Sequence, residues 1–154
     1  MTQRFWSGSS IAQLEPHQIF VFGANPEFRH GAGAAKAALA FGAKYGSGRG
    51  IVGQTYGLVT KNLTANFYEK ETGITYRRYG ERSVSPEQIK TNIAELYACA
   101  RANPHLDFLI TYQYLPNQKR SLNGYNSQET LEMFTSMPVP DNVLFHDSYG
   151  PHLS

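Results

Sequence analysis

Runs of apolar, strand-forming residues recur along this chain and are separated by more polar segments. A short continuous run of this kind predicts a strand that is covered on both faces, as in a parallel sheet. Two glycines inside one run, Gly53 and Gly57, indicate that other parts of the chain approach it closely. A glycine-rich connection, residues 46–50, precedes that run. The pattern predicts strands at residues 19–22, 51–60, 108–112 and 142–146.

A β-hairpin is predicted between the second and third of these strands. Residues 65–69 and 74–79 carry aromatic or β-branched side chains, and the segment between them, residues 70–73, ends in Gly73. A short turn with a glycine between two such arms is typical of a hairpin.

Helical signals fill the intervals between the strands. Ser85 can cap a helix, Pro86 suits its first position, and Gln88 can complete a capping box. Pro104 marks the end of this helix. Its apolar stripe consists of Ile89, Ile93, Leu96, Tyr97 and Ala100.

Two further helices are expected. An alanine-rich helix is predicted over residues 34–43. A third helix carries Leu131 and Phe134, and either Asn126 or Ser127 caps it.

The alternation of strands and helices over 154 residues predicts one α/β domain, residues 1–154. Its sheet is expected to be mixed and largely parallel, flanked by helices, with the hairpin as an insertion. Ligands of such sheets bind beyond the carboxyl ends of the strands. If the strands run in one direction, three segments share a rim: the loop 23–36, Thr60 with Lys61, and the polar loop 113–125.

The charge and aromatic content of the chain indicate which kinds of partner it can bind. Charged residues make up 17% of the chain and the net charge is +2, too small to indicate a nucleic-acid partner. Two local basic spots, at 77–78 and 119–120, are interpreted as solvated loops or phosphate contacts. The 10 Tyr and 9 Phe supply rings for a core or for stacking on a flat ligand.

Cysteine and histidine usage excludes several kinds of site. Cys99 is the only cysteine, so neither an intramolecular disulfide nor a thiolate cluster can form, and we expect a small core residue. The histidines are scattered without metal-ligand spacing, so no metal or other cofactor is expected. The N-terminus lacks a secretory pattern, and no apolar run approaches the ~20 residues of a membrane span. We therefore expect a cytoplasmic protein without a membrane partner, and the oligomeric state stays open.

The most specific chemistry lies where the first strand ends. Gly23 breaks the strand, Asn25 and Pro26 turn the chain, and Gly31 and Gly33 open the alanine-rich helix. Such glycines let the backbone approach a bound group and leave N–H donors at a helix start, which favours phosphate or diphosphate. The spacing is neither the dinucleotide fingerprint nor a P-loop. A tight turn whose glycines serve only packing is the alternative.

Most of the chain resembles a family of small phage-encoded proteins. That family is in turn similar to the macrodomain, whose glycine loops hold the diphosphate and distal ribose of ADP-ribose. The resemblance implies a macrodomain-like fold and an ADP-ribose-like ligand. The segments that carry it are residues 19–25, 29–36, 53–61, 86–89, 104–111 and 124–125.

Carried onto this chain, the resemblance places Asn25 at the distal ribose and residues 31–33 in the first glycine loop. Gly124 and Tyr125 would form a second clamp. Two departures from the pattern concern ligand choice. No early acidic residue matches the macrodomain aspartate that contacts adenine, and residues 112–121 replace the Gly-Cys-Gly stretch after the fourth strand.

Three functions follow as hypotheses. The first is a binder that captures an ADP-ribose-like nucleotide, such as a cyclic ADP-ribose signal made by a host defence system. The second is a hydrolase of ADP-ribosyl esters or of a terminal phosphate, with Asn25 orienting water and His30 acting as acid or base. The third is a protein-interaction module.

Backbone N–H groups and cations would serve phosphate, and tyrosines, including Tyr112 and Tyr114, would stack on a base. The residues expected to form the ligand site are Gly23, Ala24, Asn25, Arg29, His30, Gly31, Ala32, Gly33, Lys36, Gln54, Tyr56, Thr60, Lys61, Lys119, Arg120, Asn123, Gly124 and Tyr125.

Overall fold

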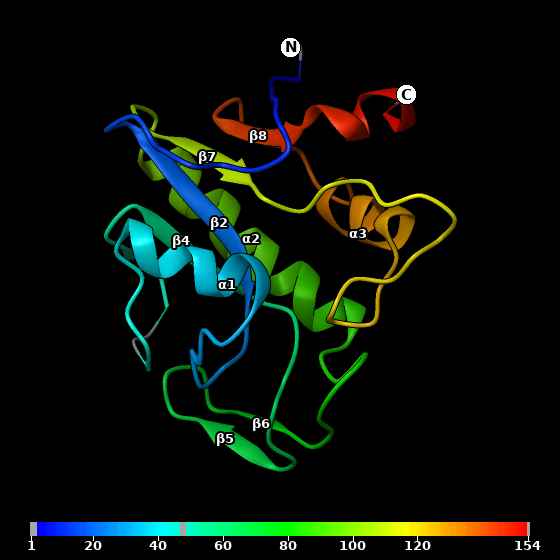
Figure 1. Ribbon diagram of the computed structural model, residues 1–154. Helices are drawn as coiled ribbons and strands as arrows, with labels where there is room; N and C mark the ends of the chain where they lie inside the picture. The colour runs from blue at the N-terminus through cyan, green and yellow to red at the C-terminus, as the bar shows by residue number, and fades with distance from the viewer. Residues whose placement is uncertain (1–2, 47–48, 154) are drawn as a thin grey trace.

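The computed structural model describes residues 3–46 and 49–153, so residues 47 and 48 of the glycine-rich connection lie outside it. The strands of its main sheet are β1 (Phe5–Trp6), β2 (Gln18–Ala24), β3 (Ile51–Val52), β4 (Thr55–Val59), β7 (Asp107–Ile110) and β8 (Val143–His146). They lie in the order β1-β8-β7-β2-β4-β3 (Figure 1). A separate two-stranded sheet pairs β5 (Phe67–Glu69) with β6 (Ile74–Tyr76).

The central strand β2 runs parallel to both of its neighbours. Phe20 lies opposite Thr55 of β4 and Leu109 of β7. Strand β7 is parallel to β8 and β8 to β1, whereas β3 is antiparallel to β4. The α/β class with a mixed, largely parallel sheet is confirmed, and the three strands expected to share a rim do run in one direction.

Helices lie on both faces of this sheet, which explains the continuous apolar run at residues 19–22 of β2. Helix α1 (Gly33–Ala38) lies in front of β2 in Figure 1, and α2 (Pro86–Ala102) lies behind the sheet. Residues 19–22 are each 2–4% exposed as a result. Burial of four such side chains is a main source of the stability of the sheet.

Helices α2 and α3 (Ser127–Phe134) follow the predicted caps closely. The Ser85 side chain accepts the N–H of Gln88, and the predicted apolar stripe of α2 is buried. The Gln88 amide donates to Asn92 rather than back to Ser85, so the first capping box is only half formed. Asn126 caps α3 and forms a complete box with Glu129.

The prediction of one strand over residues 51–60 is wrong. The chain reverses after Val52, and β3 and β4 form an antiparallel pair in which Val52 lies opposite Thr55. Gly53 makes the turn with a φ of +60°, a conformation that favours glycine. A Cβ atom at position 53 would lie 2.8 Å from the Cα atom of Gly42. Because Gly42 and Gly53 approach so closely, a tight turn fits within a segment whose apolar residues suggest one continuous strand.

The alanine-rich helix is also shorter than predicted. Helix α1 ends at Ala38, and a 3₁₀ turn, η1 (Leu39–Phe41), follows it. Gly42 then adopts a left-handed φ of +103° and donates its N–H to the carbonyl of Leu39, which ends the helical segment. The prediction of a helix to residue 43 relied on alanine content and took no account of Gly42.

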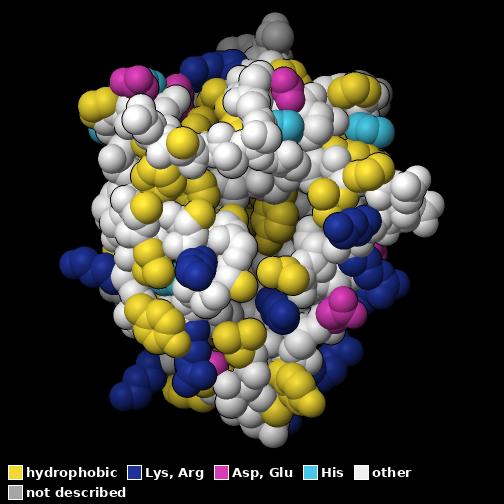
Figure 2. Space-filling view, in the orientation of Figure 1, with side chains coloured by type: hydrophobic (Ala, Val, Ile, Leu, Met, Phe, Trp, Pro, Cys, Tyr) yellow, Lys and Arg dark blue, Asp and Glu magenta, His cyan; other side chains and the backbone are white. Residues whose placement is uncertain are grey.

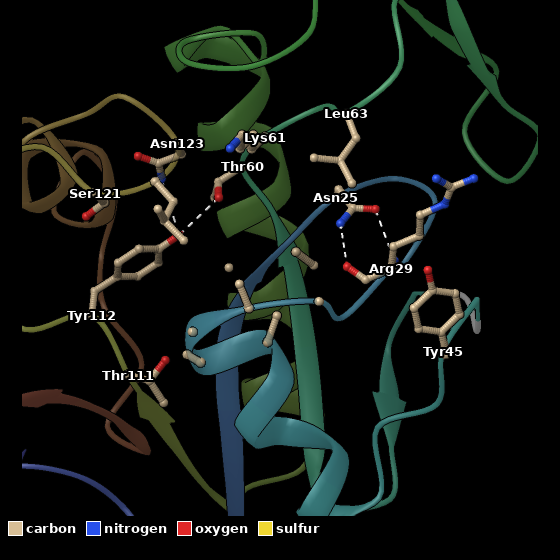
Figure 3. A pocket seen from close by; sticks show the side chains of 18 of the residues that line it. Asn25, Arg29, Tyr45, Thr60, Lys61, Leu63, Thr111, Tyr112, Ser121 and Asn123 are labelled. Atoms are coloured by element: carbon tan, nitrogen blue, oxygen red, sulfur yellow. Dashed lines mark hydrogen bonds between the residues drawn. The ribbon is translucent and has the colours of Figure 1, made fainter.

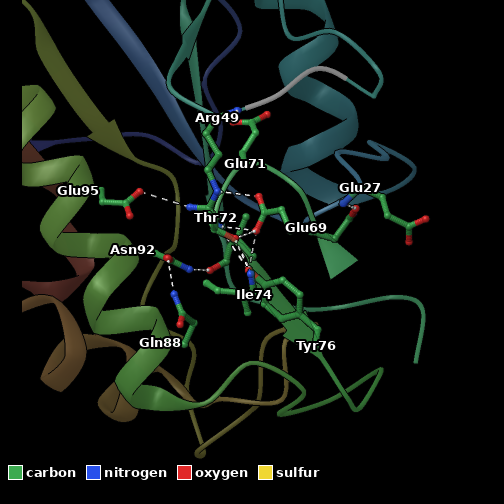
Figure 4. Close-up of polar contacts among 12 residues, drawn as sticks. Glu27, Arg49, Glu69, Glu71, Thr72, Ile74, Tyr76, Gln88, Asn92 and Glu95 are labelled. Carbon is green, nitrogen blue, oxygen red and sulfur yellow. Dashed lines mark hydrogen bonds and ion pairs between the residues drawn. The ribbon is translucent and has the colours of Figure 1, made fainter. Parts of the chain in front are cut away.

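The hairpin β5–β6 was predicted correctly, and a buried ion pair holds it to the rest of the domain (Figure 4). Arg49 donates from Nε and Nη2 to the Glu69 carboxylate over 2.7 and 2.9 Å. The Tyr76 hydroxyl donates to Glu69 over 2.8 Å, and Arg49 also reaches Glu95 of α2 at 3.4 Å. Burial alone would raise the pKa of Glu69, but the bonds from Arg49 and Tyr76 outweigh it and lower that pKa.

Strand β1 has only two residues and carried no strand signal in the sequence. It pairs with β8 at the sheet edge, and the Trp6 indole donates to the carbonyl of Ile110 over 2.8 Å. After β8 the chain forms a 3₁₀ segment, η2 (Asp147–His152). None of the described helices is long and apolar enough to cross a membrane.

Candidate functional site

A pocket of about 750 Å³ opens where β2, β4 and β7 end. Gly23 and Ala24 close β2, Thr60 follows β4, and Thr111 follows β7, so the pocket lies at the carboxyl edge of the sheet. Figure 2 shows the hollow near the centre of one face of the molecule. This is the position at which parallel α/β sheets bind ligands.

Asn25 shapes one side of the pocket. Its Oδ1 atom accepts the N–H groups of Glu27 and Arg29 over 3.2 and 3.1 Å, and its Nδ2 atom donates to the carbonyl of Arg29 over 2.8 Å. Between them Phe28 has a φ of +53°, which is rare for a bulky residue and is stabilised here by its burial. One hydrogen of the Asn25 amide is left for a ligand.

Tyr112 forms the opposite side (Figure 3). Its hydroxyl lies 3.0 Å from Thr60 Oγ1 and accepts the Asn123 amide over 3.2 Å. Burial raises the pKa of this phenol, although the bonds to Thr60 and Asn123 lower it in part. The phenol therefore stays neutral at ordinary pH. The three side chains tie the end of β4 to the chain after β7.

Backbone N–H groups on two sides of the pocket have no acceptor within residues 3–46 and 49–153. They belong to Gly31 and Ala32 in the glycine loop, and to Leu122 and Asn123 in the facing loop. Helix α1 has only six residues, so its dipole is too short to make an anion site by itself. The lining instead includes residues of two separate loops whose N–H groups, within the described chain, are free to donate.

Two cations line the pocket on different sides (Figure 3). Arg29 is half-exposed and pairs with Glu27 at 3.3 Å. Lys61 follows the end of β4, and among the described residues it has no carboxylate partner. An anion in the pocket would therefore meet Lys61 without first displacing a carboxylate.

The structure brings much of the predicted site together. The predicted residues that line the pocket come from all three expected segments of the rim: Gly23, Ala24, Asn25, Arg29, Gly31, Ala32, Gly33, Thr60, Lys61 and Asn123.

Three predicted residues lie elsewhere because they are parts of the core or of the opposite edge. His30 is buried against Phe22, and its Nε2 atom faces the carbonyl of Lys44 at 3.1 Å. Gln54 precedes β4 at the other end of the strand and donates to the Gln18 carbonyl. Tyr56 packs edge-on against Phe108 in the core.

The remaining predicted residues surround the pocket without lining it. Lys36 is exposed on α1, and Lys119 and Arg120 are exposed between the lining residues Leu115 and Ser121 of their loop. Tyr125 is buried, and its hydroxyl donates to the carbonyl of Val84. Gly124 packs against the backbone of the 80–82 segment, where a Cβ atom would lie 2.8 Å from the N atom of Arg82.

Sequence reasoning missed part of the lining. Thr111 follows β7 just as Thr60 follows β4, so the rule that found Thr60 also covers Thr111. Tyr45 and Leu63 come from segments without a recognisable motif. The other missed lining residues with larger side chains are Leu115, Ser121 and Leu122.

The titratable side chains that line the pocket are those of Arg29, Tyr45, Lys61 and Tyr112. In the described part of the chain, no cluster of three or more His, Cys, Asp or Glu side chains is placed to hold a metal ion. Comparison of the chain with protein-family models, with curated proteins and with solved structures gave no significant match.

Proposed function

We propose that this pocket binds a nucleotide of the ADP-ribose type and retains it unchanged. Its volume of about 750 Å³ lies within the range of roughly 300–1,000 Å³ that is usual for small-molecule and cofactor sites. Its place at the carboxyl edge of a parallel sheet is the usual one for nucleotide sites. Because the match to a macrodomain pattern rests on sequence alone, the physical support comes from the lining residues.

The observation that carries the proposal is the pairing of two donor loops across one cavity. Gly31 and Ala32 on one side, and Leu122 and Asn123 on the other, have N–H groups without an acceptor in the described chain. A diphosphate presents oxygens in several directions and can accept bonds from both loops at once. Lys61 and Arg29 supply positive charge to the lining.

The remaining walls suit the other parts of such a nucleotide. The free hydrogen of the Asn25 amide and the hydroxyls of Thr60 and Tyr112 can bond ribose. Tyr45 and Leu63 are 65% and 40% exposed at the mouth and offer apolar surface to a base. The ligand would thus extend from a polar floor to an apolar rim.

Retention is proposed over hydrolysis because of the side chains present. The described lining has no carboxylate, imidazole or thiol, the usual groups for general acid–base or nucleophilic catalysis. His30, the candidate acid or base, points into the core instead, and burial lowers the pKa of its imidazole. A protein of this kind would act by sequestering an NAD-derived signal, as a phage counter-defence protein would.

A capture experiment tests this proposal. The protein is incubated with ADP-ribose, NAD and cyclic ADP-ribose isomers in turn, separated from free ligand, denatured, and its released ligand analysed. Release of intact nucleotide in proportion to protein supports sequestration. Conversion of excess nucleotide by catalytic amounts of protein would make it an enzyme, and no retention of any of them would reject the proposal.

A further inference from the structure

Exposed aromatic and cationic side chains lie on the hairpin and on the segment that follows it. Tyr68 and Tyr79 are 56% and 68% exposed. Tyr68 lies opposite Thr75 of β6, and the chain directly after the end of β6 carries the exposed residues Arg77, Arg78 and Tyr79. Tyr68 and Thr75 share the outward face of the hairpin, whereas Tyr76 is buried. The exposed rings and arginines therefore lie on this face and on the segment directly after it.

Further cations lie beside this face. Arg78 donates from Nη2 to the carbonyl of Arg82 over 3.0 Å, and Arg82 donates to Glu129 over 2.7 Å. The backbone of Arg120 forms an isolated antiparallel β-bridge with that of Asn126. Asn126 caps α3, the helix that carries Glu129. We call Arg77, Arg78, Arg82, Lys119 and Arg120 the basic edge.

The basic edge is joined to the rim of the pocket. The N–H of Arg82 donates to the carbonyl of Asn123, a lining residue, over 2.7 Å. Asn62 pairs with Gly80, which places the 77–80 segment alongside the lining residue Leu63. Figure 2 shows Lys and Arg side chains gathered beside and below the hollow. The small net charge of the whole chain therefore conceals a local excess of positive charge.

We propose that the basic edge binds a single-stranded nucleic acid whose terminal nucleotide enters the pocket. Cations along a path attract successive phosphates, and exposed aromatic rings stack on unpaired bases, which duplexes do not offer. Binding at the edge is independent of the proposed function. Entry of the terminal nucleotide into the pocket rests on the proposed function, because it requires the pocket to bind a nucleotide.

The test measures fluorescence anisotropy of labelled single strands of about ten nucleotides, DNA and RNA, with the matching duplex for comparison. We expect the single strand to bind more tightly than the duplex, and its affinity to fall about tenfold between roughly 50 and 200 mM salt. The double variant Lys119→Glu/Arg120→Glu should lose about tenfold in affinity, and Tyr79→Ala about fivefold or more.

The matched control is Lys90→Glu/Arg101→Glu on α2, which changes the net charge equally and should leave binding within about twofold of wild type. Lack of single-strand binding, an equal loss in the control, or equally tight binding of polyglutamate would overturn the proposal. The proposal would also be overturned if the duplex bound and Tyr79→Ala left its affinity unchanged.

ADP-ribose binding to the same variants separates the two proposals. If ADP-ribose does not bind but the strand does, the pocket proposal fails and the edge stands. If ADP-ribose binds normally and the strand does not, the edge proposal fails alone.

Discussion

The hydroxyl of Tyr112 occupies the position that a side chain at residue 23 would need. A Cβ atom at Gly23 would collide with that hydroxyl and would lie 3.1 Å from Tyr112 Cζ and 3.3 Å from Thr60 Oγ1. Gly23 is therefore required by the floor of the pocket, and its φ is not in the left-handed region. The end of β2 and the chain after β7 fit together only because this position lacks a side chain.

This relationship predicts a strong coupling between the two positions. Gly23→Ala should destabilise the protein by about 1–3 kcal/mol through overpacking, measured by urea unfolding. Tyr112→Phe removes the colliding oxygen, so Gly23→Ala should cost less in that background, with a coupling energy of about 1 kcal/mol. Simple additivity of the two changes would show that the contact does not set the local packing.

Filling the pocket should abolish nucleotide binding without unfolding the protein. Gly33 is unsuitable for this test, since its φ of +58° strains any other residue. At Gly31 a Cβ atom would meet no heavy atom within 4 Å, so Gly31→Val should fold with a stability change within about 0.5 kcal/mol. ADP-ribose titration by calorimetry should then show no binding.

The matched control for Gly31→Val is Ala37→Val, on the exposed side of α1 and outside the lining. It should bind ADP-ribose as the wild type does. Normal affinity in a folded Gly31→Val protein would place the ligand elsewhere.

Asn25 combines a structural role with an expected ligand contact. Asn25→Ala leaves the N–H groups of Glu27 and Arg29 without their acceptor, which should lower stability. It also removes the amide hydrogen proposed to bond ribose, so it should weaken ADP-ribose binding by about 1–3 kcal/mol. Asn25→Asp keeps that acceptor but removes the amide donor and adds negative charge. The Asn25→Asp variant should be more stable than Asn25→Ala and should still bind ADP-ribose more weakly than the wild type. Calorimetry that finds full affinity in both variants would exclude a ligand contact at Asn25.

The sequence predicted best the parts of the fold where local signals agree with tertiary packing. The apolar run of β2, the caps at Ser85 and Asn126 and the hairpin each carry their own signal, and the structure has all of them. The run over residues 51–60 failed because the turn at Gly53 depends on its contact with Gly42. Such a contact between glycines leaves no periodicity in the sequence.

The site was predictable where it follows the strand ends and less so elsewhere. Thr60 and Lys61 come directly after β4, so topology alone places them on the rim. His30 lies between the lining residues Arg29 and Gly31, yet its side chain turns into the core. A loop residue's direction depends on its backbone angles, and here the left-handed Phe28 sets a path that no motif encodes.

The free energy of unfolding should fall at acid pH because Glu69 becomes protonated and its ion pair with Arg49 is lost. The folded pKa of Glu69 lies below the ordinary value, so its ion pair contributes fully above the unfolded pKa, and the contribution is lost as the pH falls through the folded pKa. Glu69→Gln should destabilise the protein at neutral pH by about 3 kcal/mol, since among the described residues it leaves the largely buried Arg49 guanidinium with Glu95 as its one carboxylate partner.

Thermal unfolding between about pH 3 and pH 7 checks this, because the difference between wild type and Glu69→Gln should shrink towards the acid end. Glu87→Gln, an exposed change on α2, is the control and should follow the wild type. A constant difference across the range would mean that Glu69 does not titrate as its surroundings imply.

The last prediction concerns which amides a nucleotide protects. An amide exchanges slowly when its N–H is hydrogen-bonded, and those of Gly31, Ala32, Leu122 and Asn123 have no acceptor in the described chain. They should exchange fast in the free protein and slowly with ADP-ribose bound, as followed by hydrogen exchange. The stretch 116–120 belongs to the same long loop but does not line the pocket, so its exchange should stay unchanged. Protection across the whole loop would instead mean that it closes over the ligand as one unit, and protection confined to residues 31–32 would reduce the site to a single donor loop.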